Sequence, residues 1–281
     1  MVREAPVTRN VQHRVITALG ALSVHDAGPA DGPAALLWPS LFSDGRLSWG
    51  AQLPDLHSLG WRTLLVDPPG TGNSPAARAP FTMEDCADAA RDILDVTGVD
   101  RAALLGLSWG GFVMLRVALS HPDRVSAVVL SNTSARRTSP VLRARDWLNS
   151  HLIRIGVPGG PGKLVAAGML SAHTQATDPD LVADLIATVD ALDSRGLAVA
   201  VRSVLVDRTT VANDLRALSA PTLVIAGADD TALPNPHSTE LAERIAGARL
   251  EVLPSVGHLA PREAPDVVSG LLRDFLPTTG Q

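Results

Sequence analysis

Residues 104–112 read Leu104-Leu105-Gly106-Leu107-Ser108-Trp109-Gly110-Gly111-Phe112, with a serine between glycines at the centre of an apolar stretch. An apolar run from Ala102 to Leu107 meets Gly-x-Ser-x-Gly, and an apolar segment then continues to about Leu119, which predicts a strand, a sharp turn and a buried helix. Glycines on either side of the serine let strand and helix approach closely. The turn would expose the Ser108 hydroxyl above the sheet edge, facing the N–H groups and positive dipole of the helix N-terminus. A chemically inert glycine-rich turn is the alternative for the motif alone, and the strand and helix around it argue against that alternative.

Composition excludes several classes of protein. A chain of 281 residues can bury a substantial core without disulfides, and its one cysteine, Cys86, excludes a disulfide framework and a cysteine-rich metal site. We expect that thiol to be buried in a helix. The net charge of −5 argues against a nucleic-acid partner or an anionic membrane surface. Residues 1–12 are polar and no apolar run approaches about 18 residues, so we expect a cytoplasmic protein without a secretory signal or a membrane span.

The order of the remaining segments predicts an α/β fold. Two short β-like runs, Arg14–Leu19 and Ala21–His25, are expected to form an antiparallel pair at one edge of the sheet. Later strands are continuously apolar, which is typical of parallel strands covered by helices on both faces. The sequence therefore predicts a mostly parallel, eight-stranded sheet covered on both faces. The other expected strands are Ala34–Trp38, Thr63–Asp67, Ala102–Leu107, Val125–Ser131, Thr222–Ala226 and Leu250–Leu253; the expected helices are Trp49–Leu59, Thr82–Val96, Trp109–Leu119, Ser238–Ala246 and Ala264–Leu276.

The pattern changes after the strand that ends at Ser131. Residues 133–218 are helical in period, with a glycine- and proline-rich interruption at Gly156–Gly162. We expect this segment to be a helical cap inserted into a core made of residues 1–132 and 219–281.

Two further residues are expected beside Ser108. A serine hydroxyl needs a base within hydrogen-bond reach, and that base needs an orienting group. His258 directly follows the last strand, and Asp230 follows the strand Thr222–Ala226, so both should lie at the same sheet edge as Ser108. His237 is the alternative base, and the neighbouring Asp229 is the alternative acid, although a turn-capping role suits Asp229 better.

With these residues in view, the chain resembles an α/β-hydrolase-fold protein over nearly its whole length. The order of nucleophile, acid and base matches that fold, as do Asp67–Ser74, His121–Val125 and Gly227–Asp230. Within the fold, Ser40–Leu41, the Gly-Leu-Ser-Trp-Gly-Gly elbow and Leu130–Ala135 look most similar to the 3-oxoadipate enol-lactonase-like branch. The resemblance implies a catalytic triad of Ser108, Asp230 and His258 that acts without a cofactor or a metal.

The sequence departs from the family after the third strand. Many members have His-Gly there, where the next backbone N–H completes the oxyanion hole, and this chain has Trp38-Pro39. The enol-lactonase-like branch also lacks His-Gly. We therefore expect the donors to be the N–H of Trp109 and that of Ser40 or Leu41.

The expected function is that of a serine hydrolase acting on a small carboxylic ester or lactone. Arg136, Arg137 and Trp147, at the start of the cap, are candidate substrate-binding residues; the alternative is that the arginines form a solvated helical face. Because a fold does not fix a reaction, a carbon–carbon bond hydrolase, a perhydrolase or acyltransferase, or a lyase stays open, as does a receptor-like ligand-binding protein. The oligomeric state is left undetermined.

Overall fold

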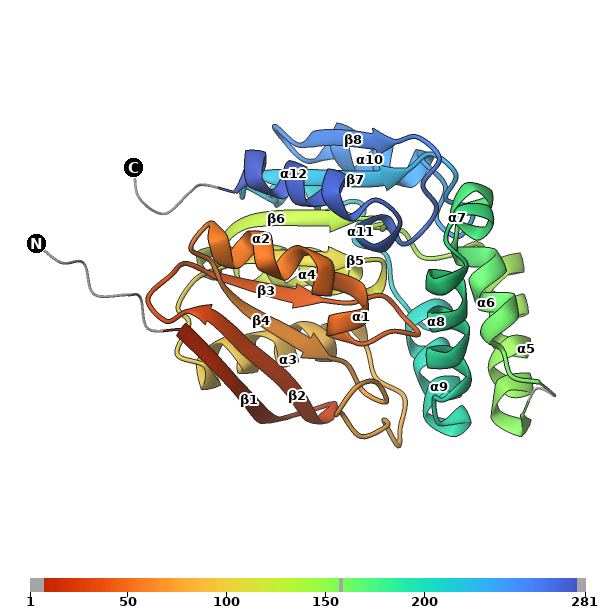
Figure 1. The fold of residues 1–281 in the computed structure, drawn as a ribbon. Coiled ribbons are helices and arrows are strands. Elements are labelled where there is room, and N and C mark those ends of the chain that lie inside the picture. The colour runs from red at the N-terminus through yellow and green to blue at the C-terminus, as the bar shows by residue number, and fades with distance from the viewer. Residues whose placement is uncertain (1–7, 157–158, 277–281) are drawn as a thin grey trace, which may run out of the picture.

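The computed structural model describes residues 8–156 and 159–276, which form one eight-stranded sheet with helices around it (Figure 1). The strands lie in the order β1-β2-β4-β3-β5-β6-β7-β8. Their bounds are β1 Thr8–Thr17, β2 Gly20–Pro29, β3 Ala34–Trp38, β4 Arg62–Asp67, β5 Ala102–Leu107, β6 Val125–Ser131, β7 Thr222–Gly227 and β8 Arg249–Leu253.

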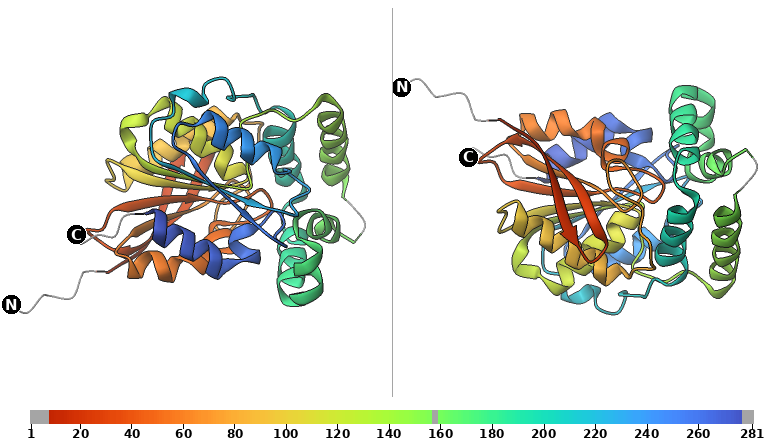
Figure 2. Two further views of the ribbon diagram at one scale, coloured as in Figure 1. Left: turned by 90° about the horizontal axis from the view of Figure 1, so that it is seen from above. Right: turned by 90° about the horizontal axis from the view of Figure 1, so that it is seen from below.

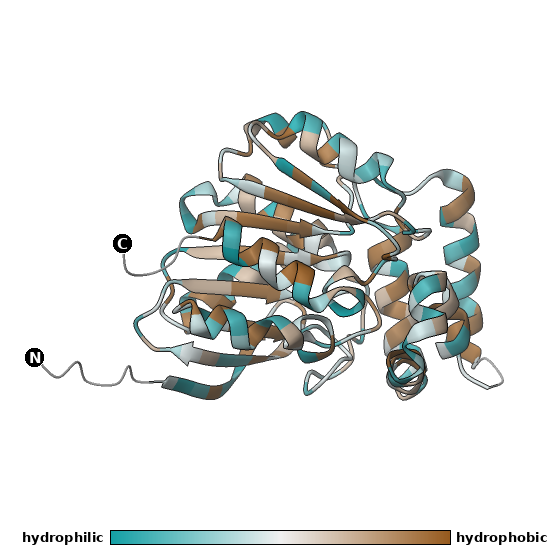
Figure 3. Cartoon of the chain, turned by 45° about the horizontal axis from the view of Figure 1, so that its top comes forward, coloured by the Kyte–Doolittle hydropathy of each residue, from teal (hydrophilic) through white to brown (hydrophobic). Residues whose placement is uncertain are grey.

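Most neighbouring strands of the sheet are parallel, and the antiparallel pairs lie at one edge. β1 and β2 form the predicted antiparallel pair at one edge, and β2 also runs antiparallel to β4. All other neighbouring strands are parallel. The central strands are buried along their length and are mostly hydrophobic in Figure 3. The mostly parallel sheet is therefore confirmed, although β1 and β2 are longer than predicted.

One layer of helices covers each face of the sheet (Figure 2). On one face, apolar side chains of α1, α2 and α12 join those of the strands in one core cluster; on the other, α3, α4 and α10 contribute to a second. The bounds of the helices that flank the sheet are α1 Gly45–Trp49, α2 Leu53–Ser58, α3 Met83–Val96, α4 Trp109–Ser120, α10 Pro236–Arg244, α11 Ala260–Glu263 and α12 Pro265–Phe275.

One predicted helix is divided, and another has nearly its predicted bounds but is preceded by a short extra helix. The segment predicted as Trp49–Leu59 ends α1, passes through a 3₁₀ turn and continues as α2, whose first turn holds Pro54. The segment predicted as Ala264–Leu276 follows the short helix α11, and Pro265 begins α12. Proline lacks the N–H that an ongoing helix needs, so it starts a new helix instead of extending the old one.

In the described part of the chain between β6 and β7, five α-helices lie beyond the carboxyl ends of the parallel strands (Figure 1). They are α5 Pro140–Ile155, α6 Gly162–Met169, α7 Ala172–Thr177, α8 Pro179–Asp190 and α9 Ser194–Val201, followed by a π-helical turn at Arg202–Val206. They occupy the stretch for which a cap was predicted, and the division of the chain into core and cap stays a prediction. In the described ranges, no helix is long and apolar enough to cross a membrane.

Candidate active site

Ser108 lies on a strained turn between β5 and α4. Its φ of 53° is in the region that residues with a side chain seldom adopt. A Cβ on Gly106 would lie 2.4 Å from the carbonyl carbon of Gly110, and a Cβ on Gly110 would lie 2.1 Å from the carbonyl oxygen of Trp38. Only glycine at both positions allows the strand, the turn and the helix to pack this closely. Sterics therefore explain the Gly-x-Ser-x-Gly pattern here.

Ser108, His258 and Asp230 form one hydrogen-bonded chain. His258 Nε2 lies 2.8 Å from Ser108 Oγ, and His258 Nδ1 lies 2.8 Å from Asp230 Oδ2. The three residues follow β5, β8 and β7, whose carboxyl ends meet at one edge of the sheet. All three side chains are buried. The alternatives are placed elsewhere: Asp229 is exposed, and His237 Nδ1 pairs with Ser134 Oγ at 3.0 Å.

Asp230 is held by a set of donors. Its Oδ1 accepts the N–H groups of Ala232 and Leu233, both at 2.9 Å, and its Oδ2 also accepts Asn132 Nδ2 at 3.0 Å. Burial acts to raise the pKa of Asp230, but His258, the N–H of Leu233 and the amide of Asn132 together hold that pKa below its ordinary value. Asp230 is therefore an ionised partner for the imidazole.

Asn132 helps to position Asp230, which the sequence did not reveal. It follows β6 and has a φ of 47°, and its Nδ2 also donates to the carbonyl of Gly257 at 2.9 Å. One side chain thus ties the Asp230 carboxylate to the residue before His258. In the sequence, Asn132 was singled out only as part of Leu130–Ala135, which carries the resemblance to the enol-lactonase-like branch. Its place directly after a parallel strand was the available signal.

Glu263 anchors the loop that carries His258, and sequence reasoning also missed it. Its carboxylate accepts the N–H groups of Gly257 and Leu259, each at 3.1 Å, and that of Ser171 at 2.9 Å. In addition, the N–H of His258 donates to the carbonyl of Met169 at 2.7 Å. The histidine loop is therefore fixed to the helical segment between β6 and β7. No motif marks this contact, because it joins residues about 90 positions apart.

The hydrogen bonds of the backbone N–H groups distinguish between the candidate oxyanion donors. The N–H of Ser40 donates to Ser48 Oγ at 3.3 Å, whereas the N–H groups of Leu41 and Trp109 have no acceptor within the described part of the chain. Leu41 and Phe42 form a turn, and Phe42 has a φ of 72°, which suits the third residue of a type II turn. Of the two alternatives for the second donor, the contacts favour Leu41.

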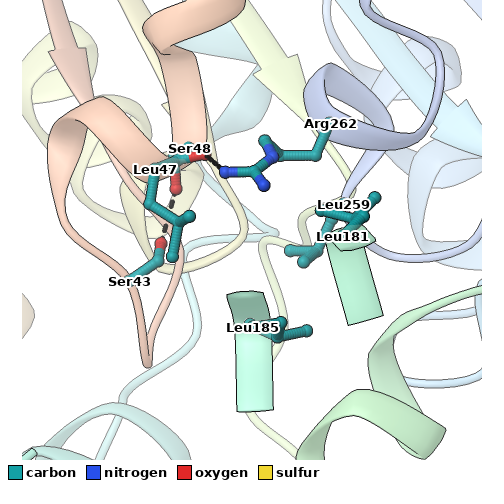
Figure 4. Close-up of a pocket in the computed structure, with 7 residues that line it drawn as sticks. All are labelled: Ser43, Leu47, Ser48, Leu181, Leu185, Leu259 and Arg262. Atoms are coloured by element: carbon teal, nitrogen blue, oxygen red, sulfur yellow. Dashed lines mark hydrogen bonds between the residues drawn. The ribbon is translucent and has the colours of Figure 1, made fainter. Parts of the chain in front are cut away.

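Two cavities lie between the sheet and the helical segment. The first is lined by the candidate donors Leu41 and Trp109, by residues 69–71 of the loop after β4, and by Leu192, Leu197 and Ala200. The second, drawn in Figure 4, is bordered by Ser43 of the loop after β3 and by Leu47 and Ser48 of α1. Leu181, Leu185 and Leu259 give it an apolar wall, and at its rim Arg262 donates to the carbonyl of Leu47. Both cavities are mainly aliphatic, with Phe42 and Trp109 as the aromatic lining residues.

The three candidate substrate-binding residues lie outside the lining of both cavities. Arg136 forms a two-bond ion pair with Glu240, and Arg137 is exposed. Trp147 is 47% exposed and packs against His151. None of the three lines either cavity. The structure gives each of them a surface position.

A different arginine is buried nearby. Arg208 places its guanidinium 3.5 Å from the ring centroid of Phe112 and donates to the carbonyl of Arg136 at 2.7 Å. Burial, and then the neighbouring charge of Arg116, lower the pKa of Arg208 to about 9, while Asp146 opposes this shift. Arg208 thus fixes the start of the helical segment against α4. Its position late in that segment gave no sequence signal.

No metal ligand set accompanies these residues. Within residues 8–156 and 159–276, no three His, Cys, Asp or Glu side chains lie together in a way that could hold a metal ion. The groups gathered at the sheet edge are a hydroxyl, an imidazole, a carboxylate and free N–H groups. These groups can carry out nucleophilic attack with proton transfer.

Comparison with known proteins gives the family. A family model described as "alpha/beta hydrolase fold" matches residues 35–265. The chain belongs to the α/β-hydrolase family. It is thus an enzyme of this fold, and the predicted fold class is confirmed.

Three relatives of this α/β hydrolase illustrate the range of the family. "Putative carbamate hydrolase RutD" of Variovorax paradoxus is 33% identical over 254 residues, 89% of this chain and 93% of that protein. An esterase from Thermogutta terrifontis is 26% identical with a TM-score of 0.87, covering 95% of this chain and 98% of its own. The enol-lactonase from Burkholderia xenovorans LB400 is 27% identical with a TM-score of 0.86, covering 94% and 99%. The predicted enol-lactonase-like branch is thus among the structural neighbours.

Proposed function

We propose that this α/β hydrolase cleaves a small carboxylic ester or lactone through an acyl-enzyme on Ser108. The observation that carries the proposal is the chain of two 2.8 Å contacts from Asp230 through His258 to Ser108. An activated serine needs a base in reach and an orienting group behind that base, and this chain has both. The esterase and enol-lactonase neighbours give the same reaction class independent support.

Each group has one role in the proposed reaction. His258 Nε2 takes the proton from Ser108 as Oγ attacks the acyl carbon, and returns it to the leaving alkoxide. Asp230 accepts the Nδ1–H of His258, which fixes the tautomer and stabilises the imidazolium. The N–H groups of Trp109 and Leu41 hold the oxyanion. Water, activated by His258, then releases the acid and restores Ser108.

The cavity beside the elbow supports a small, apolar acyl group. It is lined by Leu41 and Trp109 on the core side and by Leu192, Leu197 and Ala200 on the helical side. We assign residues 133–218 the role of a cap on this basis. Substitutions in that lining should change substrate preference more than they change the chemistry, because they touch the acyl group and not the reacting atoms.

A carbamate is a second candidate substrate. The observation that favours it is the 33% identity to a protein whose name is that of a carbamate hydrolase. A carbamate ester has the same attackable carbonyl and the same developing oxyanion as a carboxylic ester. The triad and its donors would therefore act on it without rearrangement.

A substrate panel tests the proposal. Purified protein and its Ser108→Ala variant are compared on p-nitrophenyl acetate, butyrate and octanoate, on a γ-lactone and on a p-nitrophenyl carbamate. We expect turnover of short esters or the lactone by the wild type and none above background by the variant. Equal rates for both proteins, or turnover of the carbamate alone, would overturn the ester and lactone assignment.

A further inference from the structure

Helix α5 has the reverse of the usual distribution of side chains. Its buried residues are polar, Asp146 and Ser150. The opposite face carries Val141, Leu148, Leu152 and Ile155, at spacings that place them along one side of a helix. Val141 and Ile155 are 78% and 77% exposed. We refer to these four residues as the α5 outer face.

This surface is not a scattering of single apolar residues. Trp147 on α5 and Leu164 on α6 are also exposed, and both helices lie at the edge of the molecule farthest from β1 (Figure 1). Large exposed hydrophobic residues in the rest of the described chain are dispersed over other elements. A concentrated apolar surface on an otherwise well-packed protein marks an interaction site.

The segment that contains α5 and α6, residues 136–170, is basic, although the protein as a whole is acidic. Within residues 136–170, one residue, Asp146, is acidic, and it is buried. The whole chain has a net charge of −5, so the average hides a basic region. The basic residues of the segment are Arg136, Arg137, Arg143, Arg145, Arg154 and Lys163, of which Arg136 is paired with Glu240 and Arg145 with Asp146.

We propose that the α5 outer face docks the protein on an anionic lipid surface. A helix with Leu, Ile and Trp exposed beside arginines is typical of helices that lie in the membrane interface. Basic residues beside such a helix are attracted to anionic headgroups. A second copy of the chain fits less well, because pairing two such faces would bring arginines together with no exposed carboxylate in the segment to receive them. Neither of the two cavities described above is lined by residues of this face.

The proposal revises the expectation drawn from the net charge. That expectation excluded an anionic membrane surface, and the local charge of residues 136–170 favours one. Docking would also place the active-site cavity near the lipid, since α5 packs on α9 and Leu197 of α9 lines that cavity. Docking requires no catalysis, so its test is independent of the proposed function.

Tryptophan emission provides a direct readout. Trp38, Trp49, Trp61 and Trp109 are buried, and Trp147 is the exposed tryptophan. We expect vesicles of phosphatidylcholine with phosphatidylglycerol to shift the emission to shorter wavelength and to sediment the protein. Vesicles of phosphatidylcholine alone should do this much less, and added salt should weaken the binding. Trp147→Phe should lose most of the spectral shift while still sedimenting.

Matched variants separate docking from folding. Leu148→Glu with Ile155→Glu should weaken binding at least tenfold, and Arg154→Gln with Lys163→Gln should weaken it roughly fivefold per charge. Val252→Glu with Val267→Glu changes exposed valines on β8 and α12 and should bind like the wild type. Ser108→Ala should also bind like the wild type. Thermal unfolding checks that every variant is folded.

Three results would overturn the proposal. One is failure of the wild type to bind the anionic vesicles at low salt. Another is equal binding by the Leu148→Glu, Ile155→Glu variant and the wild type. The third is a wild-type dimer in solution that this variant dissociates, which would make a second copy the occupant of the face.

Discussion

The imidazole Nε2 of His258 lies 2.8 Å from Oγ of Ser108, although 150 positions separate the two residues. The two residues meet because β5 and β8 run parallel in one sheet, so their carboxyl ends lie at the same edge as the turn that holds Ser108. The same edge supplies Asp230, and a loop anchored by Glu263 fixes His258 from the other side. The sheet thus brings together three side chains that are far apart in the sequence, and local hydrogen bonds then fix Asp230 and His258.

Replacing Asp230 by asparagine should lower kcat by about 10⁴, because the amide cannot hold His258 in the tautomer that accepts the serine proton. The measurement is steady-state hydrolysis of the best ester from the panel. Asp229→Asn, one position away and exposed, is the matched control and should retain activity. A loss of less than tenfold in Asp230→Asn would show that the carboxylate does not orient the base.

Leu41→Pro should lower kcat by about 10²–10³, because it removes the N–H assigned to the oxyanion. Proline suits the second position of a type II turn, so the turn at Leu41–Phe42 should tolerate it. Leu41→Ala keeps the N–H and should retain most of the activity. If both variants lose activity equally, the side chain of Leu41 matters and its N–H does not.

Asp26→Asn should destabilise the fold by about 3–5 kcal/mol, because it leaves the buried Arg62 guanidinium without its carboxylate. Burial acts to raise the pKa of Asp26, but Arg62, His13 and Arg9 hold that pKa below its ordinary value. The ionised carboxylate therefore stabilises the wild type above about pH 4, and this contribution falls as the pH drops through the folded-state pKa.

Urea unfolding as a function of pH measures both effects. The wild type should lose stability below about pH 4 more steeply than Asp26→Asn does. Asp88→Asn removes an exposed ion pair with Arg91 and should change stability by less than about 1 kcal/mol. Parallel pH profiles for wild type and Asp26→Asn would contradict the assigned role of Asp26.

Cys86 should not react with a thiol reagent in the folded protein. It is fully buried in α3, and burial raises the pKa of its thiol. Titration with a disulfide reagent should detect no thiol under native conditions and one per chain in denaturant. Fast labelling of the native protein would show that α3 opens locally.

The parts of this fold that follow from local pattern were predictable from the sequence. Continuous apolar runs located the central strands, and Ala34–Trp38, Ala102–Leu107 and Val125–Ser131 have the predicted bounds. The Gly-x-Ser-x-Gly turn located Ser108, and the positions of Asp230 and His258 after strands predicted that all three would meet. Their catalytic role stays a proposal.

The parts that depend on distant contacts were not predictable. Asn132 and Glu263 hold the site through bonds to residues 89–125 positions away. Arg136, Arg137 and Trp147 were selected as substrate-binding candidates from their place in the chain, yet their side chains lie at the surface. Arg136 and Arg137 precede α5, and Trp147 is on the exposed part of that helix. Leu41 could be preferred to Ser40 as the second oxyanion donor only because the structure shows that Ser48 accepts the N–H of Ser40.

Covalent labelling of Ser108 by a fluorophosphonate tests the central claim most directly. The wild type and Ser108→Ala are each incubated with the probe, and intact mass is measured, with unfolded wild type as a control for nonspecific reaction. We predict one adduct on the folded wild type, mapped to Ser108, and none on the variant or the unfolded chain. A folded wild type that takes up no probe, or a Ser108→Ala variant that is labelled equally, would contradict the account.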